Sequence, residues 1–170
     1  MNLNDYIVDV VDFPTKGIIF KDITPLLKDG EAFHYVANEM SKFIQEVGAD
    51  VICAPESRGF IFGCAISSLT KIGFVPVRKP GKLPRETISY TYSLEYGSDT
   101  LEMHKDAITK GQKVVIVDDV LATGGTIEAV ANMVKQAGGI VVGVCVLGEI
   151  EALKPRERLK DYKVFSLMKY

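Results

Sequence analysis

The sequence predicts an α/β fold with a mostly parallel central sheet flanked by helices. Short apolar runs rich in β-branched residues recur along the chain, as expected for strands that are buried on both faces. Segments with helical spacing separate most of these runs, and strands that alternate with helices are typical of a parallel sheet. Residues 79–104 break the alternation, and we expect them to form a β excursion from the sheet.

The composition sets the size and class of the protein. Its 170 residues are enough for one domain with a full core, and no interdomain linker is visible, so we expect a single domain over 1–170. A hydrophobic fraction of 47% is ordinary for a globular protein, and a net charge of −2 gives no support to nucleic-acid binding. No apolar run approaches membrane-spanning length, so no membrane partner is expected. The three cysteines lack metal-ligand spacing, and we interpret them as reduced thiols of a cytoplasmic protein.

The first half of the chain contains an arm and one strand–helix–strand unit. Residues 1–30 are punctuated by Pro and Gly and are expected to form an irregular N-terminal arm. A helix is expected at 32–47, where apolar residues keep helical spacing between Asp29 as N-cap and Gly48 as the stop. The unit that follows is expected as a strand, a helix and a strand at residues 51–54, 60–72 and 74–78.

The second half contains a hairpin and two further strands around a helix. A cationic loop at 79–87 precedes an alternating segment at 88–93, and residues 101–104 are able to pair with it. A buried strand at 114–117 leads to a helix that begins at Ile127 and is ended by Gly138 and Gly139. The last two strands are expected at residues 140–147 and 164–168.

The segment 114–126 combines a buried strand, two carboxylates and a glycine-containing loop. In open parallel sheets, ligands bind outside the carboxyl ends of the strands, where Asp118 and Asp119 are expected to hold two hydroxyls or support a metal. The backbone amides of the next residues are able to wrap a phosphate at the positive end of the following helix. These residues are Ala122, Thr123, Gly124, Gly125 and Thr126. A capped turn without a ligand is the simpler alternative, but the full combination favours a sugar-phosphate site. Neither a Walker loop nor a dinucleotide fingerprint is present.

Two further motifs carry positive charge to the same edge of the sheet. Arg58 follows a buried strand, and its fork of donors is suited to a pyrophosphate, although a solvated loop arginine is an equally simple reading. Residues 78–85 contain four cations, which usually indicate a solvated loop. Here they follow a predicted strand end, where they would stabilise a departing polyanion.

The segment 114–126 resembles the phosphoribosyl pyrophosphate (PRPP) motif of the type I phosphoribosyltransferases. Further motifs occur in family order, namely Ser-Arg-Gly-Phe, Arg-Lys-Pro-Gly-Lys-Leu-Pro and Tyr-Ser-Leu-Glu-Tyr-Gly, so the resemblance covers residues 12–170. It implies a fold with a small N-terminal and β hood over the sheet. It also implies transfer of the 5-phosphoribosyl group of PRPP to a base, with pyrophosphate as the leaving group.

The segment 13–23, Phe-Pro-Thr-Lys-Gly-Ile-Ile-Phe-Lys-Asp-Ile, resembles the arm of the adenine-specific members. On propensity alone it would be an arm packed on the sheet. The resemblance implies that it forms the hood over adenine, so that AMP is the product of a purine-salvage reaction. The backbone of Ile19 would read the adenine edge, with Lys21 beside the base. An arginine is common at the position of Lys21, and the lysine loses a planar stacking surface.

The resemblance also implies roles for the other motifs. Glu95 is expected on a flexible hood, where it would handle a proton or stabilise charge near the base. The residues expected to face pyrophosphate are Ser57, Arg58, Arg78, Lys79 and Lys82. A cis peptide bond between Glu56 and Ser57 is predicted. Mg²⁺ is expected to be held mainly by PRPP and water, without a direct protein ligand, and the family usually works as a homodimer.

Two alternatives to adenine transfer stay open from the sequence. The first is transfer to another purine such as hypoxanthine, guanine or xanthine, whose O6 acceptor would favour a lysine donor. The second is a regulator that senses PRPP without catalysis. Such proteins tend to add a DNA-binding domain or a basic surface, whereas this chain has a slightly negative charge and no spare sequence for such a domain.

Overall fold

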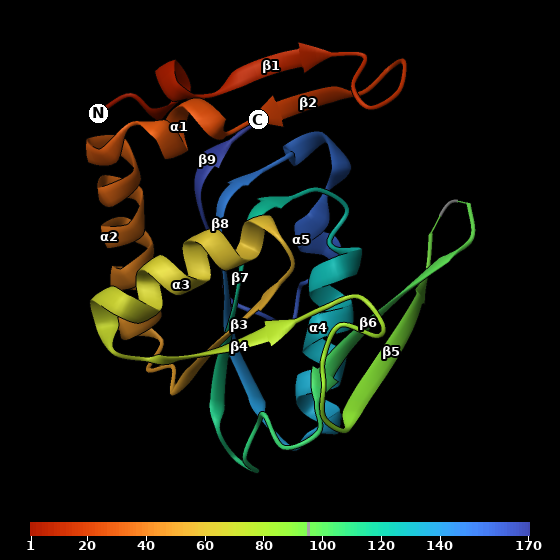
Figure 1. Ribbon diagram of the computed structural model, residues 1–170. Helices are drawn as coiled ribbons and strands as arrows, with labels where there is room; N and C mark the ends of the chain where they lie inside the picture. Colours follow the sequence, from red (N-terminus) through yellow and green to blue (C-terminus); the bar gives the residue numbers. More distant parts are fainter. Residues whose placement is uncertain (95) are drawn as a thin grey trace.

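The computed structural model describes residues 1–94 and 96–170. A parallel sheet of five strands forms the centre, in the order β4-β3-β7-β8-β9 (Figure 1). This confirms the predicted fold class. In chain order, the elements are η1 (Leu3–Tyr6), β1 (Val8–Val11), β2 (Ile19–Asp22), α1 (Thr24–Lys28), α2 (Gly30–Glu46), β3 (Val51–Pro55), α3 (Arg58–Thr70), β4 (Gly73–Val77), β5 (Thr87–Ser93), β6 (Ser98–His104), β7 (Lys113–Leu121), α4 (Gly125–Gln136), β8 (Ile140–Glu149), η2 (Glu151–Leu153), α5 (Pro155–Arg158) and β9 (Val164–Lys169).

Two hydrophobic clusters cover the two faces of the sheet. Helices α2 and α3 pack on one face, where Val115 and Val117 of β7 contribute to their cluster. Helix α4 and the β5–β6 hairpin cover the other face with Val114 and Ile116 (Figure 1). Successive strand residues therefore pack on opposite faces, which explains why residues 114–117 of β7 are all apolar.

The ends of the long helices follow the predicted signals. The Asp29 carboxylate accepts a hydrogen bond from the Ala32 amide over 2.9 Å at the start of α2, and Gly48 takes a positive φ of 68° just after its end. Gly138 takes a φ of 90° after α4. The hairpin is confirmed as well, since β5 pairs with β6 antiparallel over its whole length. No helix in the described ranges is long and apolar enough to cross a membrane.

The prediction of an irregular arm over residues 1–30 is wrong. Strands β1 and β2 form an antiparallel pair in which Asp9 lies opposite Lys21, and helix α1 follows (Figure 1). The Asp12 carboxylate closes the turn between the strands by accepting from the Gly17 amide over 2.7 Å. Four-residue strands at the surface give too short a pattern for recognition, and none of their residues is buried.

Three predicted boundaries also differ from the structure. Strand β7 runs through Asp118 and Asp119 to Leu121 because β8 continues to pair with it, so the two aspartates lie inside the strand and not beyond its end. Helices α3 and α4 begin two residues before the predicted starts, at Arg58 and Gly125. The two residues that extend each helix are polar or glycine, and this character hides the helical pattern.

Candidate active site at the carboxyl edge of the sheet

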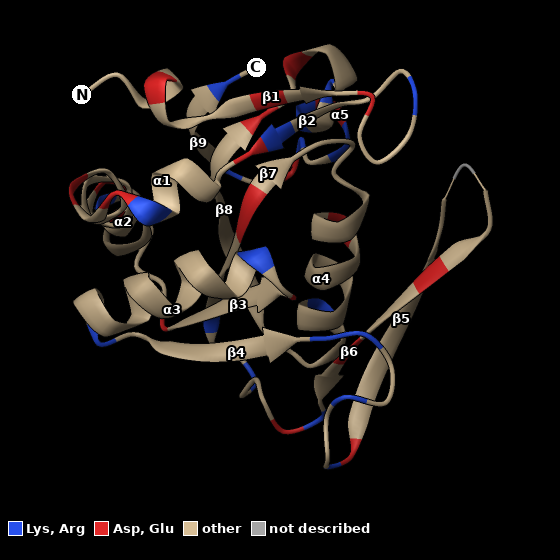
Figure 2. Cartoon of the chain, turned by 45° about the horizontal axis from the view of Figure 1, so that its top comes forward, with Lys and Arg blue, Asp and Glu red and all other residues tan. Residues whose placement is uncertain are grey.

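A polar cavity of about 340 Å³ lies where the β3–α3 loop, the end of β7 and the start of α4 meet. It brings together two motifs that are far apart in the sequence, the loop after β3 and the aspartate pair on β7 (Figure 2). Its lining consists of Pro55, Glu56, Ser57, Arg58, Asp118, Asp119, Val120 and Thr126. The edge predicted from the strand order therefore holds the predicted carboxylates and Arg58 in one cavity.

A smaller cavity of about 80 Å³ adjoins the first one, since both are lined by Asp118, Val120 and Thr126. Its lining includes all five residues predicted to hold a phosphate, which form the β7–α4 connection and the first two positions of α4. Residues 122–126 are called the phosphate loop. Gly124 takes a φ of 90°, which favours glycine, and its backbone turns the chain into α4. Backbone amides at the positive end of a helix suit an anion.

The two aspartates differ in their surroundings. Asp119 is only 3% exposed and forms an ion pair with Nε of Arg58, which also lies over the Phe20 ring at 5.3 Å from its centroid. Asp118 accepts a hydrogen bond from the Asp119 amide over 2.9 Å. Burial raises the pKa of Asp118 well above its usual range, and the neighbouring Asp119 carboxylate raises it further. The charge of Asp119 is therefore balanced by Arg58, whereas the ionised form of Asp118 is disfavoured.

Two of the cations predicted to face pyrophosphate, Arg78 and Lys82, pair with Glu56, for which the sequence predicted no role. Glu56 accepts from Nε of Arg78 over 3.1 Å, from the Lys79 amide over 2.8 Å and from Nζ of Lys82 over 2.6 Å. Burial acts to raise the pKa of Glu56, but the hydrogen bonds from Lys82 and the Lys79 amide outweigh it and hold the pKa below its usual range. The Glu56–Ser57 peptide bond is cis, as predicted.

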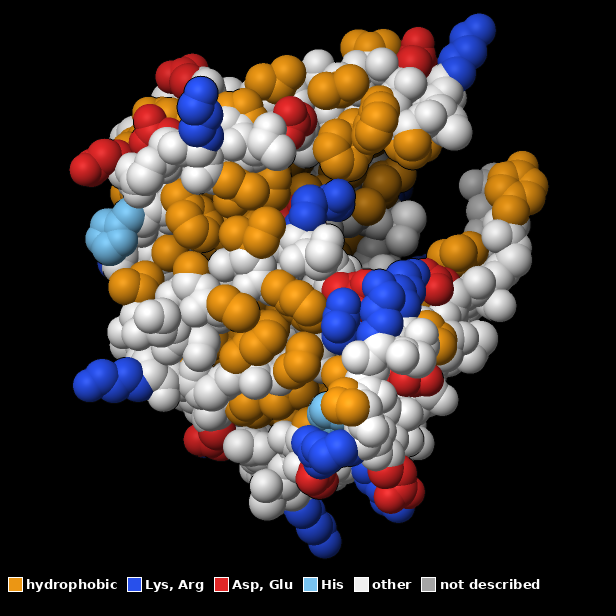
Figure 3. Space-filling model, viewed as in Figure 1, with side chains coloured by type: hydrophobic (Ala, Val, Ile, Leu, Met, Phe, Trp, Pro, Cys, Tyr) orange, Lys and Arg blue, Asp and Glu red, His pale blue; other side chains and the backbone are white. Residues whose placement is uncertain are grey.

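The β5–β6 hairpin is tied to this cation cluster and to the phosphate loop. Asp99 of β6 pairs with Nζ of Lys79, and the Tyr92 hydroxyl lies 3.4 Å from the Asp99 carboxylate and 3.3 Å from the Thr126 hydroxyl. Figure 3 shows charged side chains along the edge of the hollow between this hairpin and the β1–β2 hairpin. Tyr92 is the first residue of the Tyr-Ser-Leu-Glu-Tyr-Gly motif, but no role was predicted for it, because its contact with Thr126 joins segments that are distant in the sequence. Glu95, the predicted catalytic residue, lies outside the described residues.

The β1–β2 hairpin, which carries the predicted base-binding residues, contacts the site through Phe20, whose ring lies against Arg58. Ile19 is 53% exposed at the start of β2, and the Phe13 and Phe20 rings pack edge to face nearby. Lys21 donates to the Asp9 carboxylate over 2.7 Å and lies over the Tyr170 ring at 4.8 Å from its centroid. Its ammonium is thus held by the hairpin and the C-terminal residue.

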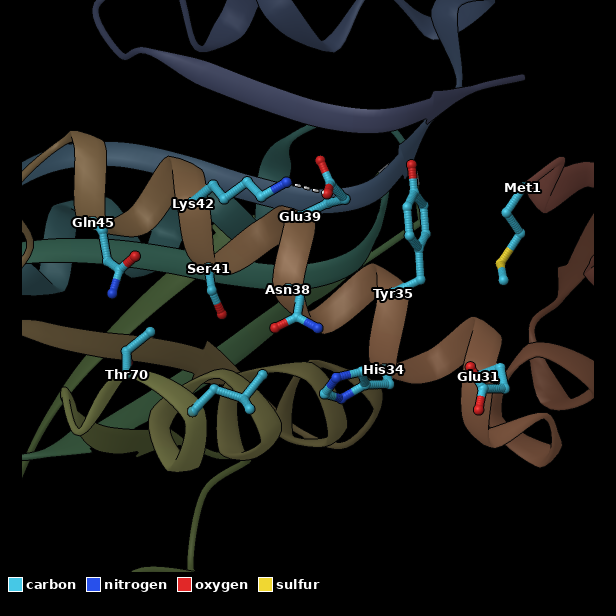
Figure 4. Close-up of a pocket in the computed structure, with 11 residues that line it drawn as sticks. Met1, Glu31, His34, Tyr35, Asn38, Glu39, Ser41, Lys42, Gln45 and Thr70 are labelled. Atoms are coloured by element: carbon cyan, nitrogen blue, oxygen red, sulfur yellow. Dashed lines mark hydrogen bonds and ion pairs between the residues drawn. The ribbon is translucent and has the colours of Figure 1, made fainter.

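A cavity of about 630 Å³, larger than these two, lies away from these residues, over helices α2 and α3 (Figure 4). His34, Tyr35 and Asn38 line it, and Glu39 pairs with Lys42 at its edge. It contains neither the aspartate pair nor the phosphate loop. The chemistry that the sequence predicts therefore belongs to the two smaller cavities.

Comparisons with known proteins agree with this geometry. The family model described as "Phosphoribosyl transferase domain" matches residues 26–169. The adenine phosphoribosyltransferase of Pseudothermotoga lettingae is 52% identical over the full length of both chains, and that of Thermosipho africanus is 55% identical over 99% of each.

Solved structures give the same result. The adenine phosphoribosyltransferase of Thermoanaerobacter pseudethanolicus matches 99% of this chain and 98% of its own, with a TM-score of 0.96 and 53% identity. The Saccharomyces cerevisiae enzyme, solved with an imino-altritol bisphosphate and adenine, matches 97% of this chain and 96% of its own, with a TM-score of 0.90 and 38% identity.

Proposed function

The chain belongs to the phosphoribosyltransferase family, and we propose that it transfers the 5-phosphoribosyl group of PRPP to adenine, giving AMP and pyrophosphate in purine salvage. The observation that carries this proposal is the pair of adjoining cavities. One contains the phosphate loop, the other contains Arg58 and Asp119, and Asp118 lines both. A sugar phosphate with a pyrophosphate at its other end needs such an arrangement.

The phosphate loop holds the 5′-phosphate of PRPP. Its amides lie at the positive end of α4, and the Thr123 and Thr126 hydroxyls add donors without adding charge. Asp118 and Asp119 hold the ribose hydroxyls, as acceptors at the edge that both cavities share. The ribose is then fixed between the loop and the pyrophosphate cations.

Ser57, Arg58, Arg78, Lys79 and Lys82 face pyrophosphate in this proposal. In the structure the four cations are paired with Asp119, Glu56 and Asp99. A polyanion would exchange these carboxylates for its own oxygens, and fixed cations would stabilise the charge that grows on the leaving group. N9 of adenine then attacks C1′ with inversion, and no covalent enzyme intermediate is required.

Adenine lies under the β1–β2 hairpin, where the Ile19 backbone reads its edge and the exposed apolar side chains cover its ring. Lys21 is a neighbour of the base and not its main contact, because Asp9 and Tyr170 hold the ammonium. Glu95 handles a proton or stabilises charge near the base when the hood closes.

The carboxylates of the site suit a hard cation such as Mg²⁺. Among the described residues Asp118 has no ion-pair partner, whereas Asp119 and Glu56 are both paired with cations. Mg²⁺ would thus be held mainly by PRPP and water, with Asp118 as the nearest protein carboxylate. When bound, the ion neutralises part of the charge on pyrophosphate.

The protein acts as a homodimer in this proposal, and an exposed apolar face supports it. Ile61 and Leu69 lie two helical turns apart on α3 and are 37% and 45% exposed. Tyr35 of α2 is 37% exposed beside the cavity over α2 and α3 (Figures 3 and 4). Light scattering should give the dimer mass for the parent and the monomer mass for Leu69→Glu. A monomeric parent would contradict the dimer.

A cytoplasmic location also belongs to the proposal. Cys53 and Cys145 are buried and free, and burial raises the pKa of Cys53 to about 12, as expected for inert reduced thiols of the core.

AMP formation from adenine and PRPP tests the function, with hypoxanthine and guanine as competing bases. We expect AMP and pyrophosphate in equal amounts from adenine and little product from the oxopurines. Preference for hypoxanthine or guanine would show that the enzyme is specific for an oxopurine and not for adenine. Binding of PRPP without pyrophosphate release from any purine would instead indicate a regulator.

A further inference from the structure

Helix α5 packs directly on the phosphate loop, although it is far from that loop in the sequence. An ideal Cβ built on Gly124 would lie 3.5 Å from the carbonyl oxygen of Pro155 and 3.6 Å from Cγ of Leu159. Figure 1 shows α5 beside the N-terminal end of α4. Pro155 and Leu159 are buried, so they anchor this short helix against the loop.

Arg158, the last residue of α5, extends over the two glycines of the loop. Its Cδ lies 3.6 Å from the Cβ position of Gly124, and its Nη1 lies 2.9 Å from the Cβ position of Gly125. The guanidinium therefore occupies the space beside Gly125 that a side chain would otherwise take. This position is next to the amides proposed to hold the 5′-phosphate.

The charge of Arg158 is not neutralised within the described part of the chain. The other four arginines each pair with a carboxylate, as Arg58 with Asp119, Arg78 with Glu56, Arg85 with Asp106 and Arg156 with Glu149. No carboxylate of a described residue lies within 4.0 Å of the Arg158 guanidinium, and none of its donors has a hydrogen-bond acceptor there. A guanidinium without an anion beside an anion-binding loop points to a ligand.

We propose that Arg158 is a binding residue for the 5′-phosphate of PRPP and AMP. The inference rests on the proposed function only for the identity of the ligand, since any sugar phosphate in the loop would present the same group. The neutral donors of the loop surround the phosphate, and Arg158 adds the positive charge and a planar pair of donors that matches phosphate oxygens. The sequence reading missed it because it falls in a short segment without periodicity.

Arg158→Gln tests the proposal, with Arg158→Lys as the conservative variant. Calorimetry should measure the affinity of each protein for AMP, adenosine and ribose 5-phosphate. A charge-assisted hydrogen bond is worth roughly a tenfold change in affinity at an accessible site. We expect Arg158→Gln to lower the affinity for AMP and for ribose 5-phosphate about tenfold, and to leave the affinity for adenosine unchanged. Lysine keeps the charge but loses the fork, so Arg158→Lys should recover part of the affinity.

Lys160→Gln is the matched control, because it removes an exposed positive charge two residues away and should leave all three affinities unchanged. AMP and ribose 5-phosphate affinities of Arg158→Gln within twofold of the parent would overturn the proposal. Equal losses for AMP and adenosine would also overturn it, since packing alone would then explain the position of Arg158.

Ribose 5-phosphate carries the phosphate without the base, so its result does not depend on the reaction. A parent that binds ribose 5-phosphate through Arg158 but forms no AMP would contradict the proposed function alone. A parent that forms AMP with Arg158→Gln unaltered in the PRPP KM would contradict the role of Arg158 alone.

Discussion

At the scale of single residues, the site is organised around two adjacent aspartates with opposite electrostatic conditions. The charge of Asp119 is balanced by Arg58, whereas Asp118 has no cationic partner among the described residues and has a raised pKa because of burial and the Asp119 charge. Holding a carboxylate in such a place costs folding free energy, and functional sites commonly carry this kind of cost.

Asp118→Asn should stabilise the ligand-free protein at neutral pH while it damages activity. Below the usual aspartate pKa of 3.8 both folded and unfolded states keep the proton, so Asp118 contributes no pH dependence there. As the pH rises, the unfolded state ionises before the folded state, and the parent loses stability until the raised folded pKa is passed. The amide variant does not titrate, so it avoids this loss. Its free energy of unfolding in urea, relative to the parent, should therefore grow as the pH rises from the usual aspartate pKa to the raised pKa of folded Asp118.

The same variant should lose about 10–100-fold in kcat/KM, the worth of one hydrogen bond to a charged group. Asp161→Asn, which replaces an exposed aspartate far along the chain, serves as the control and should change neither quantity. A stability difference between Asp118→Asn and the parent that stays constant with pH would contradict the raised pKa.

Gly124→Ala should destabilise the protein by at least about 1 kcal/mol, because its φ of 90° disfavours any side chain. The nearest atom to the new Cβ lies 3.5 Å away, which is ordinary contact, so the cost is conformational and not steric. Binding of PRPP should weaken as well, since the loop amides would shift.

Gly30→Ala is the matched control for the conformational cost. Gly30 opens α2, and no atom lies within 4 Å of its Cβ position, so alanine should be neutral or slightly stabilising there. Thermal unfolding of both variants measures the difference, and equal melting temperatures would refute the argument.

At the scale of elements, the β5–β6 hairpin connects the pyrophosphate side of the site to the phosphate loop. Lys79 pairs with Asp99, and the Tyr92 hydroxyl lies between Asp99 and Thr126. The hairpin therefore has polar contacts at the site in addition to its apolar packing against α4.

Tyr92→Phe should reduce kcat/KM for PRPP by about 2- to 10-fold, as expected for the loss of a neutral hydrogen bond of about 0.5–1.5 kcal/mol. The ring stays in the cluster under the hairpin, so the melting temperature should change little. Tyr90→Phe is the control, because Tyr90 packs on the same face of β5 without a contact to Thr126. Equal effects of the two substitutions would exclude a specific role for the Tyr92 hydroxyl.

The elements that could be predicted from the sequence are those with strong local signals. The Asp29 cap and a run of apolar residues at helical spacing define α2, and β-branched residues define β3, β7 and β8. The extension of β7 to Leu121 could not be predicted, because it depends on pairing with β8 and not on local pattern. The two strands of the N-terminal arm were missed for a similar reason, since their pairing is stabilised by contacts between the strands, such as Asp9 with Lys21.

The residues of the candidate site also fall into two groups, those that could be predicted from local motifs and those that could not. Motif residues such as Arg58 and Asp119 were predicted, and the structure places them in one cavity. Glu56, Tyr92 and Arg158 act through partners that are distant in the sequence, so only the folded chain reveals them.

At the scale of the whole molecule, the cations proposed to face pyrophosphate have counterions within the protein. Three carboxylates pair with these four cations, so the pyrophosphate group of a substrate must replace existing ion pairs there. Such an exchange favours a substrate that arrives with its own cation, since the released carboxylates then keep a positive neighbour.

Chelation should therefore abolish activity and leave the ligand-free fold unchanged. Over residues 1–94 and 96–170 no group of three or more His, Cys, Asp or Glu side chains is arranged to hold a metal, so Mg²⁺ is expected to enter with PRPP. EDTA should remove AMP formation, and excess Mg²⁺ should restore it. The melting temperature of the ligand-free protein should be the same with and without EDTA.

Ligand-induced stabilisation completes this test. PRPP with Mg²⁺ at about 100 times its Kd should add about 2.7 kcal/mol to the free energy of unfolding, which raises the melting temperature by several degrees. EDTA should cancel most of that rise, because the carboxylates of the site repel PRPP when Mg²⁺ does not reduce its charge. A drop in the melting temperature of the ligand-free protein on chelation would instead reveal a resident metal that contributes to the fold.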